Sequence, residues 1–163
     1  MKHLKRPLFV IAVFVAIGLS ACKKGDDTPA GVSFQLDSTT PVKFLNPVGT
    51  YGTSNGGFEL SANNGTTANF ELFVLNNLHT GSFDIASDQA QIVYASPLTT
   101  GSGSLIAVPS ALSGTVVITT YSKTTVAGTF SFSGKDLEGN TYNVTDGTFS
   151  TGYSSVATIP VMF

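Results

Sequence analysis

The stretch AGTFSFSG, residues Ala127 to Gly134, decides the fold class. Aromatic and small polar residues alternate in it with a spacing of two, so Phe130 and Phe132 share one face of an extended chain. The opposite face carries the hydroxyl groups of Thr129, Ser131 and Ser133. Because successive side chains of a strand point to opposite faces, the pattern predicts a β-strand with one buried face and one hydrated face.

The residues that follow this strand predict a hairpin. A polar turn with a glycine, Asp136 to Asn140, separates it from a second alternating run that includes Tyr142 and Val144. Asp146-Gly147 is a second turn signal, and we expect it to redirect the chain into Thr148-Phe149.

The same spacing continues through most of the chain from Val32 onward. The composition agrees, because 21 Thr residues favour strands and 17 Gly residues suit the turns between them. We therefore predict an all-β fold, a single antiparallel β-sandwich or flattened barrel of about 9–11 short strands. The expected strands are Val32 to Leu36, Pro41 to Leu45, Gly57 to Ala62, Ala68 to Leu75, Gly81 to Ala86, Gln91 to Ala95, Gly114 to Tyr121, Thr125 to Ser133, Thr141 to Thr145, Thr148 to Gly152 and Val156 to Val161.

Two segments depart from simple alternation. Residues Phe70 to Leu75 are apolar on both faces, which favours a central strand buried on both sides over a strand that lines a cavity or a partner surface. Residues Ser96 to Ser113 show no clear alternation, and we expect a long loop there.

The first 21 residues have the layout of a secretory signal peptide. Lys2, Lys5 and Arg6 precede a run of apolar and small residues from Leu8 to Leu19. A helix of that length rises about 18 Å, whereas the hydrocarbon core of a bilayer is about 30 Å thick. We therefore expect a cleaved signal peptide at 1–21 rather than a permanent membrane span.

The residues after the apolar run indicate a lipid anchor. Leu19, Ser20, Ala21 and Cys22 are similar to the lipobox of bacterial lipoproteins, and this resemblance implies that Cys22 carries a covalent lipid and begins the mature chain. Two or more acyl chains hold a protein firmly on a membrane. The alternative is a soluble secreted protein with an incidental cysteine.

A short charged stretch follows the cysteine. Lys23, Lys24, Asp26 and Asp27 resemble the sorting tag of Bacteroidota lipoproteins, which implies an outer-membrane lipoprotein exposed at the cell surface, with the periplasmic face as the alternative. Residues 22–31 lack apolar periodicity and predict a flexible tether. The β domain is then expected at 32–163.

The net charge of the chain argues against one class of partner, nucleic acids. The full chain has a formal net charge of −2, and removal of the signal peptide leaves five lysines, no arginine and ten acidic residues. Binding to nucleic acid depends on neutralising phosphates, so we expect no nucleic-acid partner.

A longer motif resembles a known family. The stretch SGTVVITTYSKTTVAGTFSFSGKDLEGNTYNVTDGTFS, Ser113 to Ser150, resembles the C-terminal signature of an uncharacterised family of small Bacteroidota lipoproteins, a domain of unknown function. A weaker similarity extends upstream through GGFELSA and HTGSFDI. The resemblance implies a β fold on a lipid anchor and implies no activity.

The sequence contains few candidates for catalysis. Gly52 to Gly56 match the GxSxG pattern of serine hydrolases around Ser54, but a nucleophile elbow needs a helix after the serine, and a turn and a strand are expected here. The only histidine after the signal peptide is His79, in a predicted turn. Glu59 and Glu71 lie on separate predicted strands and show no carboxylate pairing in the sequence. We expect a protein that is not an enzyme.

The sequence also contains few candidate residues for metal binding or for covalent modification. Asp136, Glu138 and Asn140 alternate in a glycine-containing loop but lack EF-hand spacing, so we expect no metal and no cofactor apart from the lipid on Cys22. Asp37-Ser38-Thr39 resembles the O-glycosylation motif of this bacterial group, which makes glycosylation there a hypothesis.

The function expected from these features is non-catalytic binding at the cell envelope. The ligand would be a glycan, a small molecule or a partner protein, and the alternative is a structural or envelope-assembly component without a small ligand. An aromatic platform would favour a glycan, since sugars stack on rings. Its candidate residues are Tyr51, Tyr94, Tyr121, Tyr142 and Tyr153.

Overall fold

The computed structural model describes residues 30–65, 68–75, 77–95, 113–136 and 139–157. Within these ranges all the regular elements are strands, which confirms the predicted all-β fold. The strands are β1 (Gly31–Leu36), β2 (Thr40–Leu45), β3 (Val48–Gly52), β4 (Phe58–Asn63), β5 (Asn69–Val74), β6 (Gly81–Asp84), β7 (Ala90–Ala95), β8 (Ser113–Tyr121), β9 (Thr125–Lys135) and β10 (Thr141–Val156).

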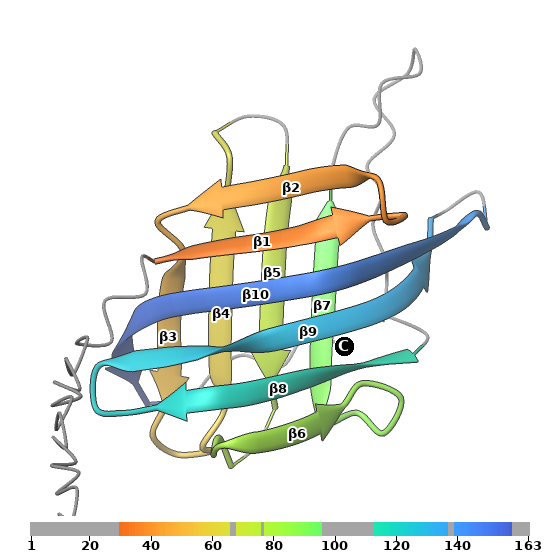
Figure 1. Ribbon diagram of the computed structural model, residues 1–163. Helices are drawn as coiled ribbons and strands as arrows, with labels where there is room; N and C mark the ends of the chain where they lie inside the picture. Colours follow the sequence, from red (N-terminus) through yellow and green to blue (C-terminus); the bar gives the residue numbers. More distant parts are fainter. Residues whose placement is uncertain (1–29, 66–67, 76, 96–112, 137–138, 158–163) are drawn as a thin grey trace, which may run out of the picture.

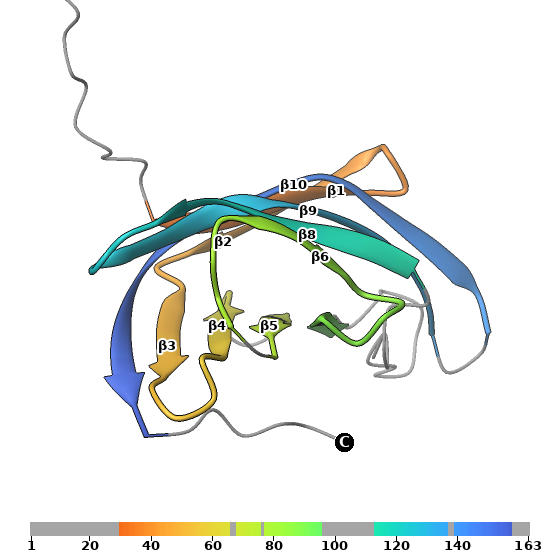
Figure 2. The same cartoon turned by 90° about the horizontal axis from the view of Figure 1, so that it is seen from below.

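The strands form two layers of one nearly closed, barrel-like sheet (Figure 1). The front layer contains β2, β1, β10, β9, β8 and β6 side by side, and the back layer contains β3, β4, β5 and β7. In Figure 1 the front strands run across the back strands, and Figure 2 shows the two layers one above the other. The space between them holds the hydrophobic core.

Strand β10 joins the two layers. Along one edge it pairs antiparallel with β1 from Val144 to Ser150, and its last residues, Tyr153 to Val156, pair with β3. The β10–β3 pairing is parallel, whereas the other pairings among the described strands are antiparallel. A strand that bends from one layer into the next is a common way to form the corner of such a sheet.

The prediction of a turn at Asp146-Gly147 was wrong. The two expected strands are one strand, β10, with a bulge between Val144 and Gly147. Asp146 has a φ of 53°, and a Cβ on Gly147 would lie 2.4 Å from the carbonyl oxygen of Phe130. An Asp-Gly pair supplies the left-handed residue and the close approach that a bulge needs, so the same residues that signal a turn also serve a bulge.

Strand β3 was missed by the sequence analysis. Its sequence, VGTYG, contains two glycines and follows a proline, a composition typical of a turn. The structure explains Gly49, because a Cβ there would lie 2.5 Å from the carbonyl oxygen of Gly152 on β10. The parallel pairing of β3 and β10 therefore depends on this glycine.

An aromatic cluster fills the centre of the core. Phe34 contacts Phe44, Phe70, Phe130 and Tyr94, with ring centroids 5.2 to 6.4 Å apart. These residues come from both layers and are at most 4 % exposed. We call these five residues the core cluster.

The two-sided burial expected for β5 holds only in part, because on its outer face Asn69 is exposed and Glu71 is half-buried. Phe70, Leu72 and Val74 belong to the core, and Phe73 on the opposite face is 4 % exposed. A long loop was expected at Ser96 to Ser113. Residues 96–112 lie outside the described residues, and Ser113 is the first residue of β8. Of the strand expected at Val156 to Val161, Val156 ends β10 and residues from 158 onward lie outside the described ranges.

Candidate functional site

The predicted anchor and sorting residues, Leu19 to Asp27, lie outside the described residues. The description begins at Ala30, and Gly31 is the first residue of β1.

Three of the five candidate tyrosines come together. Tyr51 on β3, Tyr121 at the end of β8 and Tyr153 on β10 have ring centroids 6.0 to 6.4 Å apart. We call them the tyrosine cluster. Because β3 belongs to the back layer and β8 to the front layer, the cluster depends on the folded arrangement of both layers.

The hydroxyl groups of the tyrosine cluster are held by hydrogen bonds. The Tyr153 hydroxyl donates to the carbonyl oxygen of Ser122 over 2.7 Å. Partial burial raises the pKa of Tyr121 to about 12, and hydrogen bonds and charge interactions with Tyr51 and Tyr153 add to this effect. Tyr121 therefore stays neutral at physiological pH.

The tyrosine cluster is partly open to solvent. Tyr121 is 37 % exposed, and Tyr51 and Tyr153 pack against the core with part of their surface exposed. The cluster thus presents a neutral aromatic surface with phenol oxygens beside it. Such a surface suits a ligand with both C–H faces and hydroxyl groups.

The other two candidate tyrosines have different surroundings. Tyr94 is 4 % exposed and packs against Phe34 and Phe44 in the core. The Tyr142 hydroxyl donates to a carboxylate oxygen of Asp136 over 3.1 Å. Neither contributes to the tyrosine cluster.

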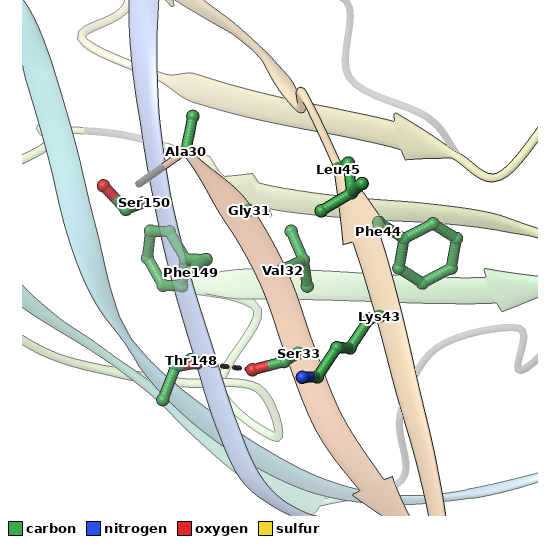
Figure 3. Close-up of a pocket in the computed structure, with 10 residues that line it drawn as sticks. All are labelled: Ala30, Gly31, Val32, Ser33, Lys43, Phe44, Leu45, Thr148, Phe149 and Ser150. Atoms are coloured by element: carbon green, nitrogen blue, oxygen red, sulfur yellow. Dashed lines mark hydrogen bonds between the residues drawn. The ribbon is translucent and has the colours of Figure 1, made fainter. Parts of the chain in front are cut away.

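A groove lies across β1, β2 and β10 (Figure 3). Its volume is about 300 Å³, near the lower limit for small-molecule sites. The Ser33 and Thr148 hydroxyls are 2.9 Å apart within it, Lys43 lies beside Ser33, and Leu45 is 73 % exposed at its rim. Sequence analysis missed this groove, because it depends on the register that places β1 between β2 and β10.

The loop considered for calcium is organised by a different interaction. Asp136 accepts hydrogen bonds from the backbone N–H and the side-chain amide of Asn140, both at 2.7 Å. With the Tyr142 hydroxyl as a third donor, this carboxylate closes the turn between β9 and β10. Glu138 lies outside the described residues. Among the residues that are described, no group of three or more His, Cys, Asp or Glu side chains could hold a metal ion.

Ser54 and His79 make separate contacts. Ser54 lies in the turn between β3 and β4, and its backbone N–H donates to the carbonyl oxygen of Ala157. The Nδ1 atom of His79 lies 2.6 Å from the carbonyl oxygen of Asn77. The His79 ring packs against the ring of Phe83. The strand that follows Ser54 replaces the helix that a nucleophile elbow requires.

Glu59 and Glu71 are brought close by the pairing of β4 with β5. In the register Glu59 is opposite Phe73 and Ser61 is opposite Glu71, so the two carboxylates occupy diagonal positions on one face. Burial raises the pKa of Glu59, and the charge of Glu71 raises it further. The sequence could not show this proximity, because it does not specify which strands pair.

No known family model, curated protein or solved structure matches the chain. Within the described ranges, moreover, no helix is long and apolar enough to cross a membrane. The function of the protein must therefore be inferred from its own residues.

Proposed function

We propose that this protein is an outer-membrane lipoprotein, anchored through Cys22, whose β domain binds a glycan without catalysing a reaction. The proposal has two parts, the anchor and the binding surface. The lipobox resemblance of Leu19 to Cys22 supports the anchor, and the sorting-tag resemblance of the following charged residues supports the cell surface.

The tyrosine cluster is the observation that carries the binding function. Its rings come from strands rather than from loops, so little conformational entropy is lost when a ligand stacks on them. Tyrosine combines an apolar face with a polar tip, which matches the alternating C–H and O–H groups of a sugar. The phenol of Tyr121 is uncharged at physiological pH, so the cluster presents a neutral ring to a ligand.

The binding experiment compares three variants on a glycan array with detergent-solubilised protein. Tyr121→Ala should weaken binding about tenfold, because loss of an aromatic contact costs about 1.5 kcal/mol. Tyr121→Phe is the matched control, since it retains the ring and should retain most of the affinity. Lys43→Ala alters the groove on β1, β2 and β10 and should leave binding unchanged.

Three results would contradict the proposed glycan site. Loss of binding in Lys43→Ala alone would move the ligand site to the groove. Equal binding by the wild type and Tyr121→Ala would remove the tyrosine cluster from the site. Absence of glycan binding by a folded wild type would favour the alternative, an envelope-assembly component without a small ligand.

The location is tested separately by protease shaving of intact cells that express the wild type or Cys22→Ala. Loss of the wild-type domain from intact cells supports a surface-exposed lipoprotein. Survival until the outer membrane is broken indicates the periplasmic face. Release of the wild type into the medium, as expected for Cys22→Ala, would contradict the lipid anchor.

A further inference from the structure

Two large aliphatic side chains are exposed where β2 leads into β3. Leu45 ends β2 and is 73 % exposed, and Val48 begins β3 and is 63 % exposed. In the described part of the chain they are the two most exposed large hydrophobic residues. Single exposed hydrophobic residues are common on protein surfaces, but two on one short connection form an apolar patch, which indicates a contact surface. We call the connection from Leu45 to Val48 the apolar corner.

The backbone of the apolar corner is held in place. Pro47 is buried between the two exposed residues, and its carbonyl oxygen accepts a hydrogen bond from the Thr151 hydroxyl over 2.9 Å. Asn46 has a φ of 54°, in the left-handed region that asparagine tolerates in sharp turns. The corner is therefore fixed to β10, and it presents its two aliphatic side chains to solvent in a defined position.

The residues around the apolar corner carry little charge. In the register Leu45 lies opposite Gly31 on β1, which has no side chain to cover it (Figure 3). Lys43 is exposed on β2, and in the sequence it is the only charged residue between Asp37 and Glu59. A phospholipid surface combines apolar chains with phosphate groups, so an aliphatic patch beside one cation matches its chemistry.

The apolar corner lies where the chain from the predicted anchor enters the domain. Gly31 is the first residue of β1 and the Cα partner of Leu45, and Figure 1 shows the start of β1 beside the end of β2. Cys22 precedes Gly31 by nine residues, which span at most about 32 Å. A linker of this length gives an effective concentration on the order of millimolar. A weak contact with lipid is therefore sufficient to hold the corner against the bilayer.

We propose that the apolar corner docks on the bilayer that carries the lipid of Cys22, with both aliphatic side chains inserted among the headgroups. Lys43 then lies beside lipid phosphates. The inference rests on the anchor of the proposed function and is independent of its glycan site. Tyr51 lies three residues beyond Val48, about 10 Å along β3. Docking at the corner therefore sets the tyrosine cluster back from the lipid contact.

The test measures the water accessibility of a spin label beside the apolar corner. The lipidated protein is purified in detergent and reconstituted into vesicles of phosphatidylcholine and phosphatidylglycerol. Cys22 is the only cysteine of the chain, and the lipid blocks its thiol, so Lys43→Cys supplies a single free thiol for a nitroxide. Lys135→Cys is the matched control, because Lys135 is exposed at the end of β9 further from Gly31. A water-soluble nickel chelate should collide several-fold less often with the label at position 43 than with the label at position 135.

The Leu45→Ser/Val48→Ser variant tests whether the aliphatic side chains cause this protection. Their loss should weaken docking at least about tenfold and raise the nickel accessibility at position 43 to that at position 135. Both side chains are exposed, so the variant should fold with an unchanged Tm. If the Tm falls, Leu45→Ser alone replaces the pair. Ser33→Ala changes the adjoining groove and should leave the protection unchanged.

Four results would overturn the proposal. Equal nickel accessibility of the two labels on vesicle-bound protein would remove the docking and leave the anchor intact. Protein that stays in solution when the vesicles are sedimented would contradict the anchor and the docking with it. Protection that persists in Leu45→Ser/Val48→Ser would assign the contact to other residues. Protection in detergent, with a dimer in solution, would indicate a second copy of this chain on the corner.

Discussion

In the core cluster the ring centroids lie 5.1 to 6.4 Å apart, and in the tyrosine cluster they lie 6.0 to 6.4 Å apart. The two clusters therefore have similar spacing, but their surroundings differ. Rings of the core cluster are at most 4 % exposed, whereas Tyr121 is 37 % exposed and hydrogen bonds hold the tyrosine hydroxyls. Ring spacing alone thus does not distinguish a stabilising cluster from a binding surface; exposure and hydroxyl groups do.

The largest expected difference between the clusters is in stability. Phe34→Ala removes the ring that contacts four others and should reduce the free energy of unfolding by about 3–5 kcal/mol. Tyr121→Ala should cost about 1 kcal/mol, because part of its ring is already hydrated. Urea denaturation of both variants measures the difference, and Phe34→Leu serves as a milder control. Similar costs for the two alanine variants would remove the distinction between the clusters.

A smaller effect is expected from the hydroxyl of Tyr153. Tyr153→Phe deletes the hydrogen bond to the Ser122 carbonyl oxygen and should destabilise the domain by about 1 kcal/mol. Tyr94→Phe is a suitable control, since it also removes one phenol oxygen but from the core cluster. If the two variants have the same stability as the wild type, the hydroxyls of the tyrosine cluster are not structurally important.

The smallest expected effect is on ionisation. Tyr121 should titrate at about 12 rather than at 10.0, and Tyr51→Phe should shift its pKa back toward 10.0 further than Tyr153→Phe does. Because the raised pKa means tighter proton binding in the folded state, the domain should lose stability as pH rises from 10.0 to about 12. Near-ultraviolet absorbance measures the titration, with Tyr121→Phe to assign it. Titration of Tyr121 near 10.0 would mean that its hydroxyl is fully hydrated.

The sequence predicted the elements whose residues alternate and whose turns have a distinctive composition. The Phe130 and Phe132 strand and the turn at Asp136 to Asn140 are examples. It failed where glycine has a long-range role. Gly49 allows close approach of β10, and Gly147 allows close approach of Phe130, so neither marks the turn that its local sequence suggests.

The candidate site was predictable only in part. Sequence composition identified five tyrosines as candidates, but their grouping depends on which strands lie next to one another. Tyr51 and Tyr153 meet through the parallel pairing of β3 with β10, and β3 was not among the expected strands. The groove and the Glu59–Glu71 proximity depend on strand register in the same way.

The pairing of β1 with β10 has a consequence for the order of folding. Ser33 and Thr148, whose hydroxyls bond across this pair, are 115 positions apart in the chain. Contacts of such high sequence separation form slowly, because a long loop must close before they are made. Strand β1, the first of the described strands, therefore lacks one of its two neighbours until β10 has left the ribosome. The complete front layer is therefore expected to form late in folding, for reasons of topology alone.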